Sequence, residues 1–109
     1  MAEPDLLLPK EDLAEIGQVF ARHLPEAEVW ICGSRVRGTA HETSDLDLVV
    51  RNPADLEARN TAPLHRIRAV LREGNLPLLV DLRDWSSLNE AARRNSEECH
   101  AVLRTPASA

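Results

Sequence analysis

The chain has 109 residues, of which 43% are hydrophobic and 28% are charged, a composition typical of one globular domain. Its formal net charge of −5 argues against nonspecific binding of nucleic acid, because such binding requires a lysine- and arginine-rich face. No segment is apolar for long enough to cross a membrane, and the amino terminus, MAEPDLLLPKED, shows no secretory signal pattern, so a cytoplasmic location is expected.

The first predicted element is a helix that begins near Pro9 and ends near Pro25. It carries one apolar stripe whose members are three or four residues apart: Leu13, Ile16, Phe20 and Leu24. The short apolar run over residues 29–32, broken by Gly33, predicts a strand that is buried on both faces.

A turn and a second strand follow. Ser34 is expected to be the N-cap of a short helical stretch through residue 37, before a loop over residues 38–44. The second strand is predicted from residue 45 to about residue 51, where an Asn-Pro pair ends it. The polar segment over residues 52–60 is typical of a surface loop.

A second long helix is predicted between Thr61, which can serve as its cap, and Gly74, which supplies its stop. Its apolar face is expected to contain Leu64, Ile67, Val70 and Leu71. The apolar run over residues 78–82 is the third predicted strand.

The last part of the chain carries Ser87 and Glu90 at capping-box spacing, which predicts a final helical segment. Residues 101–103 are compatible with a terminal strand or a tail, and residues 104–109 are expected to be disordered. This order of elements predicts an α/β fold with a small mixed sheet flanked by helices, in one domain over residues 1–109.

Two aspartates, Asp45 and Asp47, stand one residue apart at the start of the predicted second strand. Because side chains alternate between the faces of a strand, both carboxylates share one face, and Leu46 and Leu48 share the other. Like charges this close raise a pKa unless a cation lies between them, and hard oxygen ligands favour Mg²⁺ or Mn²⁺. A solvated strand end is the simpler alternative for an isolated Asp-x-Asp pair.

A third carboxylate, Asp81, completes a metal-binding triad if its strand neighbours the second one, and otherwise only caps or terminates a strand. Gly33 lets a phosphate approach the backbone closely, while the Ser34 hydroxyl can donate to a phosphate or only cap a helix. Arg35 and Arg37 are within reach of the same loop, either as phosphate contacts or as surface and partner-facing charge.

Other polar and aromatic residues have simple interpretations. Trp30 and Trp85 are expected to pack in the core or at an edge, with adenine stacking as the lesser alternative. His41 is expected to be solvated, and Asp84 to cap or salt-bridge locally. The two cysteines are far apart and no Cys or His spacing resembles a zinc site, so neither a disulfide nor a soft metal is expected.

The segment GSRVRGTAHETSDLD joins Gly-Ser, ten residues and Asp-x-Asp, and in this it resembles the polymerase-β-like nucleotidyltransferase superfamily. The similarity runs from LPKEDLAEIGQVFARHLP through EVWICGSRVRG and SDLDLVV to NLPLLVDLRDW, and points to the minimal nucleotidyltransferases, or MNT proteins. The chain departs from that pattern at Cys32, where an aromatic residue is common, and in its ending, ECHAVLR.

The resemblance implies a polymerase-β-like palm in which a hydroxyl attacks the α-phosphate of an NTP, with ATP the expected donor. NMP is then transferred and pyrophosphate released. The family motif assigns the phosphates to Gly33 and Ser34, and the metal to the three aspartates. The resemblance also implies an all-helical HEPN partner protein. In several such pairs the minimal nucleotidyltransferase is the antitoxin of a toxin–antitoxin system and adenylylates a tyrosine of the partner.

The size of the chain favours a partner as well, because a domain this small has little surface left to enclose an acceptor. A hetero-oligomer is therefore expected, and since the chain contains no tyrosine, a tyrosine acceptor would lie on another chain. Two alternatives stay open. One is a non-catalytic antitoxin or regulatory subunit that neutralises its partner by complex formation. The other is an enzyme that modifies a small hydroxylated compound such as an aminoglycoside.

Overall fold

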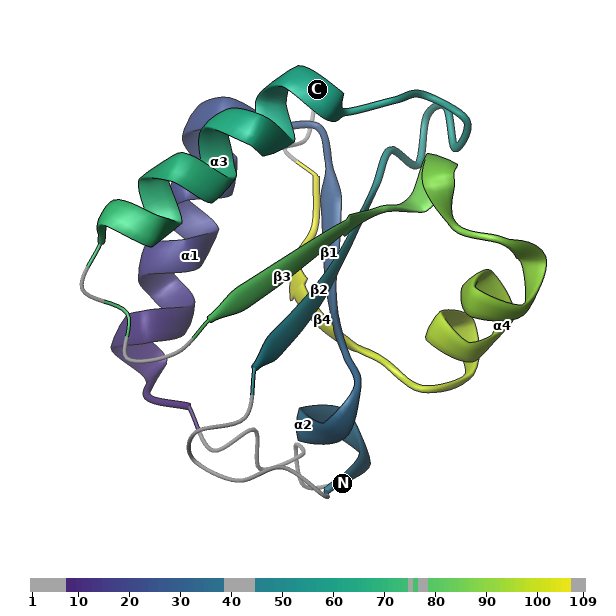
Figure 1. The fold of residues 1–109 in the computed structure, drawn as a ribbon, viewed down its shortest axis with the longest axis horizontal. Coiled ribbons are helices and arrows are strands. Elements are labelled where there is room, and N and C mark those ends of the chain that lie inside the picture. Colours follow the sequence, from purple (N-terminus) through teal and green to yellow (C-terminus); the bar gives the residue numbers. More distant parts are fainter. Residues whose placement is uncertain (1–7, 39–44, 75, 77–78, 107–109) are drawn as a thin grey trace.

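The computed structural model describes residues 8–38, 45–74, 76 and 79–106, which fold into a four-stranded mixed sheet with helices on both faces (Figure 1). The elements in chain order are α1 (Lys10–His23), β1 (Glu28–Cys32), α2 (Ser34–Arg37), β2 (Leu46–Arg51), α3 (Thr61–Glu73), β3 (Val80–Asp84), the 3-10 turn η1 (Trp85–Ser87), α4 (Glu90–Glu98) and β4 (Ala101–Arg104). The predicted α/β class and mixed sheet are confirmed. None of the helices in the described ranges is long and apolar enough to span a membrane.

The strand order is β3-β2-β1-β4, so the second and third strands are neighbours, as the metal-site prediction requires. β1 runs antiparallel to both β2 and β4, whereas β2 and β3 are parallel. The parallel pair needs a crossover connection, and α3 supplies it. The amino-terminal ends of β2 and β3 therefore lie side by side at the same end of the sheet.

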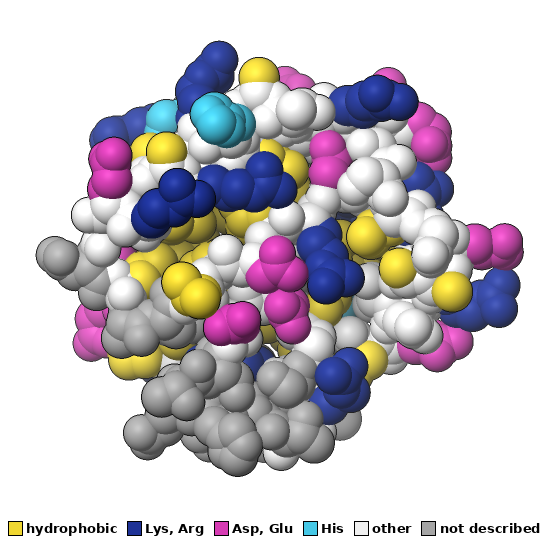
Figure 2. Space-filling view, viewed as in Figure 1, with side chains coloured by type: hydrophobic (Ala, Val, Ile, Leu, Met, Phe, Trp, Pro, Cys, Tyr) yellow, Lys and Arg dark blue, Asp and Glu magenta, His cyan; other side chains and the backbone are white. Residues whose placement is uncertain are grey.

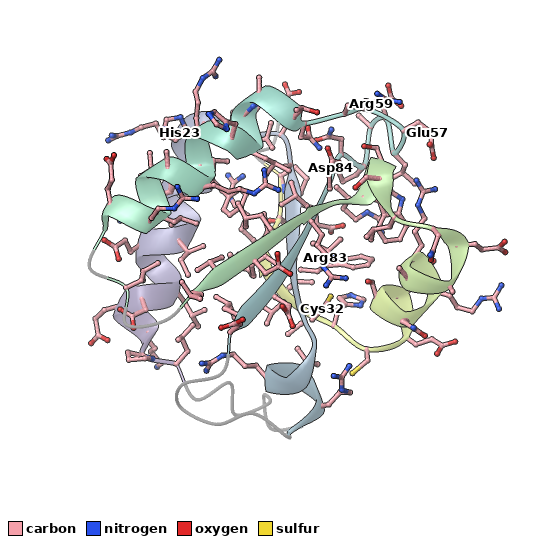
Figure 3. The ribbon with its side chains drawn as sticks, viewed as in Figure 1. His23, Cys32, Glu57, Arg59, Arg83 and Asp84 are labelled. Atoms are coloured by element: carbon pink, nitrogen blue, oxygen red, sulfur yellow. The ribbon has the colours of Figure 1, made fainter. Side chains whose placement is uncertain are left out.

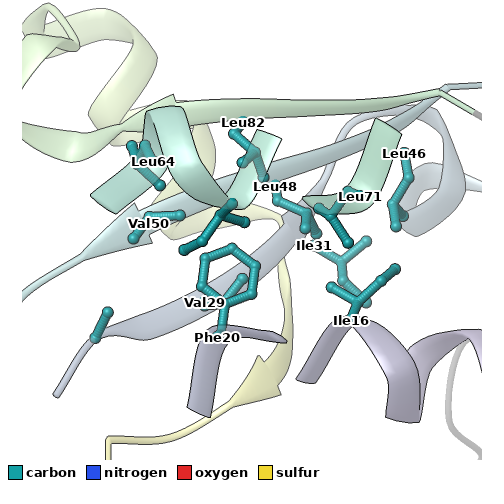
Figure 4. Close-up of a cluster of buried hydrophobic side chains, with 12 residues drawn as sticks. Ile16, Phe20, Val29, Ile31, Leu46, Leu48, Val50, Leu64, Leu71 and Leu82 are labelled. Carbon is teal, nitrogen blue, oxygen red and sulfur yellow. The ribbon is translucent and has the colours of Figure 1, made fainter. Parts of the chain in front are cut away.

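One face of the sheet is covered by α1 and α3, which lie side by side (Figure 1). The apolar stripe of each helix meets alternate residues of the strands in a continuous core (Figure 4). Its largest fully buried members are Ile16, Phe20, Ile31, Leu46, Leu48, Leu64 and Ile67. Burying side chains of this size stabilises the fold by roughly 1.5–3 kcal/mol each, so this core holds the sheet in place.

The opposite face carries a smaller cluster around Trp30 and Trp85, whose rings meet edge to face with centroids 5.7 Å apart. The guanidinium of Arg51 lies over both indoles, 4.5 Å and 4.7 Å from their centroids. His100 stacks on Trp30 with a centroid separation of 3.8 Å. Both tryptophans are buried and pack with protein groups, so the core-packing interpretation is confirmed for them.

Three predicted helix starts are wrong by one or two residues. Thr61 is the first residue of α3 rather than its cap, because Asn60 takes that position. Asp84 holds Asn60 there by accepting from its backbone N–H (2.7 Å) and its Nδ2 (3.2 Å). Ser34 likewise begins α2 instead of preceding it. The predicted box of Ser87 with residue 90 does not form.

The cap of α4 is Asn89, whose side chain accepts from the Ala92 N–H at 2.8 Å. Ser87 belongs to η1 and donates from its hydroxyl to the Asp84 carbonyl at 2.8 Å. Asp84 also accepts from the Ser86 N–H, so its predicted local capping role is confirmed. The cap of α3 thus depends on the contact between Asn60 and the distant Asp84. At α4, Asn89 is the cap because it lies directly before the first helical residue.

Further corrections concern burial and strand ends. Val70, expected on the apolar face of α3, is 39% exposed. The third strand begins at Val80, two residues after the predicted start. The terminal strand exists as β4 and includes Arg104, which was placed in the tail; its guanidinium donates to the Pro25 carbonyl at 3.1 Å. Residues 107–109 lie outside the described residues.

Candidate active site

The aspartate pair lies at the amino-terminal end of β2, with the carboxylates outside the core. Leu46 and Leu48 are fully buried beneath α1 and α3. Asp47 is half-buried and Asp45, immediately before the strand, is exposed. The predicted alternation of β2 between an acidic and an apolar face is therefore confirmed.

Asp81 lies directly beside this pair, because Asp47 and Asp81 are partners in the parallel register of β2 and β3. Partial burial raises the pKa of the Asp47 carboxyl, and the charges of Asp81 and Asp45 raise it further against the opposing charges of Arg83 and Arg37. Asp81 and Asp45 are thus close enough to Asp47 to disfavour its charged form.

Asp81 also has a cationic partner that the sequence did not suggest. Arg83, two residues along β3 on the same face, places its Nε 3.3 Å from an oxygen of Asp81. Both side chains are about half exposed, 57% for Arg83 and 49% for Asp81. Within the described part of the chain, no group of three or more His, Cys, Asp or Glu side chains is already gathered around a metal position.

Gly33 brings the turn after β1 against the Asp47 carboxylate. Its φ is +78°, in the left-handed region that favours glycine, and a Cβ built on it would overlap Oδ2 of Asp47. The Gly33 carbonyl accepts from the N–H groups of Val36 and Arg37, each at 3.2 Å, and so starts α2. The Ser34 side chain lies outside the described part, as does His41.

The two arginines of α2 differ completely in exposure. Arg35 is fully buried, so the surface and partner-facing interpretation is wrong for this residue. Arg37 is exposed and lies at the edge of a cavity that Asp47 and Gly33 also line. A phosphate contact by either arginine stays a prediction.

That cavity has a volume of about 270 Å³ and lies between the sheet and α4. It is lined by Cys32, Gly33, Arg37, Asp47, Val49, Arg83, Leu88, Ala92, Asn95, Ser96 and Cys99. Figure 3 labels Arg83 and Cys32, which lie on the same side of the sheet with α4 beyond them. We call it the sheet–α4 cavity.

A second cavity, of about 410 Å³, lies on the other side of the carboxylates, along the free edge of β3. Asp45 and Asp81 line it together with Arg68 and Arg72 of α3. Acidic and basic side chains gather side by side near the middle of the face in Figure 2. We call it the β3-edge cavity. The carboxylates therefore lie between this cavity and the sheet–α4 cavity.

Cys32 is the least expected residue of the sheet–α4 cavity. Burial raises the pKa of its thiol, although a hydrogen bond with the Ser96 side chain opposes this, and the charges of Asp47 and Cys99 add to the rise. Cys32 and Cys99 both line the cavity as free thiols despite their distance in sequence.

Four of the predicted site residues, Gly33, Asp45, Asp47 and Asp81, thus lie close together, and their functional roles stay predictions. Neither Arg83 nor the wall formed by α4 was predicted. The alternation of β3 could have found Arg83, since residues two apart share a face. Nothing in the sequence alone indicates that α4 crosses this side of the sheet.

Comparisons with known proteins agree with this arrangement. Residues 13–103 match the family described as the nucleotidyltransferase domain. Over 99 residues the chain is 33% identical to the probable protein adenylyltransferase MntA of Haemophilus influenzae, covering 89% of this chain and 82% of that relative.

Two solved structures share the fold. One, described as a toxin–antitoxin with AMP-PNP, has a TM-score of 0.62 and 21% identity, covering 86% of this chain and 73% of that chain. The other, a mutant of the toxin–antitoxin MntA-HpeT, has a TM-score of 0.68 and 20% identity, covering 85% and 73%. At these identities the likeness concerns the fold alone.

Proposed function

Because the chain belongs to the nucleotidyltransferase domain family, we propose that it transfers AMP from ATP to a hydroxyl of a helical HEPN-type partner and acts as the antitoxin of that pair. The observation that carries the proposal is the position of Asp47. Its carboxylate is adjacent both to Asp81 across the β2–β3 pair and to the left-handed Gly33 turn. The proposed metal-binding and phosphate-binding elements are thus both adjacent to Asp47.

The donor set fits Mg²⁺ or Mn²⁺, since Asp45, Asp47 and Asp81 offer only hard carboxylate oxygens. When bound, such an ion supplies charge neutralisation and polarises phosphate oxygens. Asp81 would then exchange its partner Arg83 for the ion, since the two side chains are paired in this structure. Burial and the neighbouring charge of Asp81 raise the pKa of Asp47, and a bound cation would offset this cost of its charged form.

The protein groups divide the remaining work by position. Gly33 has no side chain, which lets the Asp47 carboxylate lie against this turn, whose backbone is the proposed phosphate-binding element. Arg37, at the edge of the same cavity, can pair with a phosphate through its planar guanidinium. Asp81 faces the β3-edge cavity, where it can orient an incoming hydroxyl or accept its proton.

The relatives support the finer parts of the proposal. The curated relative is named a probable protein adenylyltransferase, and one structural neighbour is a toxin–antitoxin with AMP-PNP. These names motivate ATP as the donor and a protein as the acceptor. The chain itself contains no tyrosine, so a tyrosine acceptor would lie on the partner.

The test is AMP transfer from α-labelled ATP in the presence of Mg²⁺ to a co-expressed helical partner, with the partner's intact mass as a second readout. The double variant Asp45→Asn with Asp47→Asn should abolish labelling. Asp55→Asn, an exposed aspartate in the loop after β2, is the matched control and should label normally. Labelling that persists in the double variant contradicts the proposal.

A second candidate is a non-catalytic antitoxin that neutralises its partner by covering it. The Arg83–Asp81 ion pair favours this candidate, because it leaves one predicted metal ligand engaged by a cation of the protein itself. The same double variant decides between the two. If it still neutralises the partner as well as the unaltered protein does, complex formation and not transfer is the mechanism.

A further inference from the structure

The sheet–α4 cavity has two dissimilar ends. The residues of the metal- and phosphate-binding end are Gly33, Arg37 and Asp47. The opposite wall comes from α4 and the residues beside it: Leu88, Ala92, Asn95, Ser96 and Cys99. The last four recur at spacings of three or four, so one side of the α4 segment faces the sheet.

We propose that the base of the nucleotide lies in this cavity, between β2 and α4, and that the Asn95 side chain hydrogen-bonds to its edge. The inference rests on the proposed function and adds the residue that recognises the base. A volume of about 270 Å³ is at the small end for ligand sites, which typically begin near 300 Å³. It suits a base and sugar, with the phosphates outside at Gly33.

Three apolar side chains contribute to the lining of the cavity. Val49 comes from β2, Ala92 comes from α4, and Leu88, just before α4, packs against the cluster that contains Val49. Small-molecule sites combine such apolar surfaces with a few polar groups that fix orientation. A heteroaromatic ring in this cavity would therefore meet apolar side chains as well as polar groups that can orient it.

The polar groups of α4 leave Asn95 as the one suited to read the ring edge. The Ser96 hydroxyl donates to the Ala92 carbonyl at 2.9 Å. Arg93 is used outside the cavity, on Glu57 and the Trp85 carbonyl. The Asn95 side chain is exposed and has no hydrogen bond to any residue within the described ranges. Its amide carries both donors and an acceptor.

The first experiment compares binding of Mg-ATP with binding of Mg-tripolyphosphate, which lacks base and sugar, by calorimetry. Asn95→Leu should weaken ATP binding about tenfold, the effect of one lost pair of base-edge hydrogen bonds, and leave tripolyphosphate binding unchanged. Gln18→Leu, an exposed amide on α1, is the matched control and should change neither. Asp47→Asn should weaken both.

The second experiment tests a change of base preference. Asn95→Asp presents two acceptors and no donor, which suits the adjacent N–H groups of guanine rather than the adenine edge. The ratio of GTP to ATP affinity should rise about tenfold. An unchanged ratio together with unchanged ATP binding by Asn95→Leu overturns the base placement alone. If the unaltered protein binds neither ATP nor tripolyphosphate, the proposed function falls, and this inference with it.

Discussion

Asp47 and Asp81 are direct partners across the parallel strands β2 and β3, so two carboxylates occupy neighbouring positions on one face of the sheet. This arrangement costs stability. The pKa of Asp47 is raised by burial and by the charge of Asp81, which means that the folded state binds a proton more readily than the unfolded chain does.

The first prediction is that Asp47→Asn raises the melting temperature at pH 7. Because the folded-state pKa lies above the unfolded value, stability falls as pH rises through the folded-state pKa, and the asparagine removes this penalty. The difference between variant and unaltered protein should therefore shrink as the pH is lowered towards 4. Thermal melts across this range check it, and a lower melting temperature at pH 7 would contradict it.

Mg²⁺ provides an independent measurement. At about ten times its Kd the ion should stabilise the unaltered protein by about 1.4 kcal/mol and the Asp47→Asn variant by much less. The control is buffer without divalent ions, with NaCl added to the same ionic strength. Screening of charge repulsion by salt alone would change the stability of both proteins. Equal stabilisation of both by Mg²⁺ would place the ion elsewhere.

The second prediction concerns Gly33→Ala. The left-handed backbone should cost about 1–2 kcal/mol, and the new Cβ would in addition overlap the Asp47 carboxylate. Gly38→Ala is the matched control, because Gly38 has φ +79° and, among the residues that the structure describes, no atom lies within 4 Å of an added Cβ. Chemical denaturation should show the backbone cost in both variants and a further loss of stability in Gly33→Ala, and ATP affinity should be lost only in Gly33→Ala.

The third prediction is that Arg83→Gln tightens Mg²⁺ binding several-fold, because Asp81 loses its competing partner and the site gains net negative charge. Folding stability should change by less than about 1 kcal/mol, since the pair is half exposed. Arg94→Gln, which breaks an exposed pair with Glu90 on α4, is the control. Titration with Mn²⁺ monitored by electron paramagnetic resonance measures the affinity; no change would assign Asp81 a role apart from the metal.

The fourth prediction concerns the Cys32 thiol. Its raised pKa keeps it protonated near pH 7.5, so iodoacetamide should react slowly there and faster as the pH rises above 9. The acetamide group added to Cys32 would occupy part of the sheet–α4 cavity and should weaken ATP binding. Reaction of the Cys99→Ser variant isolates Cys32, and Mg-ATP should protect it. Labelling unaffected by nucleotide would show that the two do not share the cavity.

Local patterns in the sequence were enough to predict most helices and strands and the outward position of the Asp47 carboxylate. The alternation of Leu46, Asp47 and Leu48 determines which carboxylate faces outward, and hydrophobic spacing determines the two long helices. Helix starts were less predictable because adjacent residues can all cap. At α3 the choice of Asn60 over Thr61 depends on Asp84, which is 24 positions away from Asn60.

The misses have a common physical cause, because each depends on packing between segments that are distant in sequence. Arg35 looks like surface charge in its local context, and only the completed fold buries it. Arg83 appears as one more exposed arginine until β3 is placed beside β2. The wall formed by Asn95 and its neighbours depends on where α4 crosses the sheet, which no short-range pattern encodes.

The α4 segment is secured at both ends and bordered by open space in its middle. Asn89 fixes its beginning, and after its end His100 stacks on Trp30 and β4 pairs with β1. Substitutions on the middle turn of α4 therefore leave the contacts at both of its ends in place. If α4 contacts the base as proposed, nucleotide preference could change in evolution through one short helix, with no change at the three aspartates of the proposed metal site.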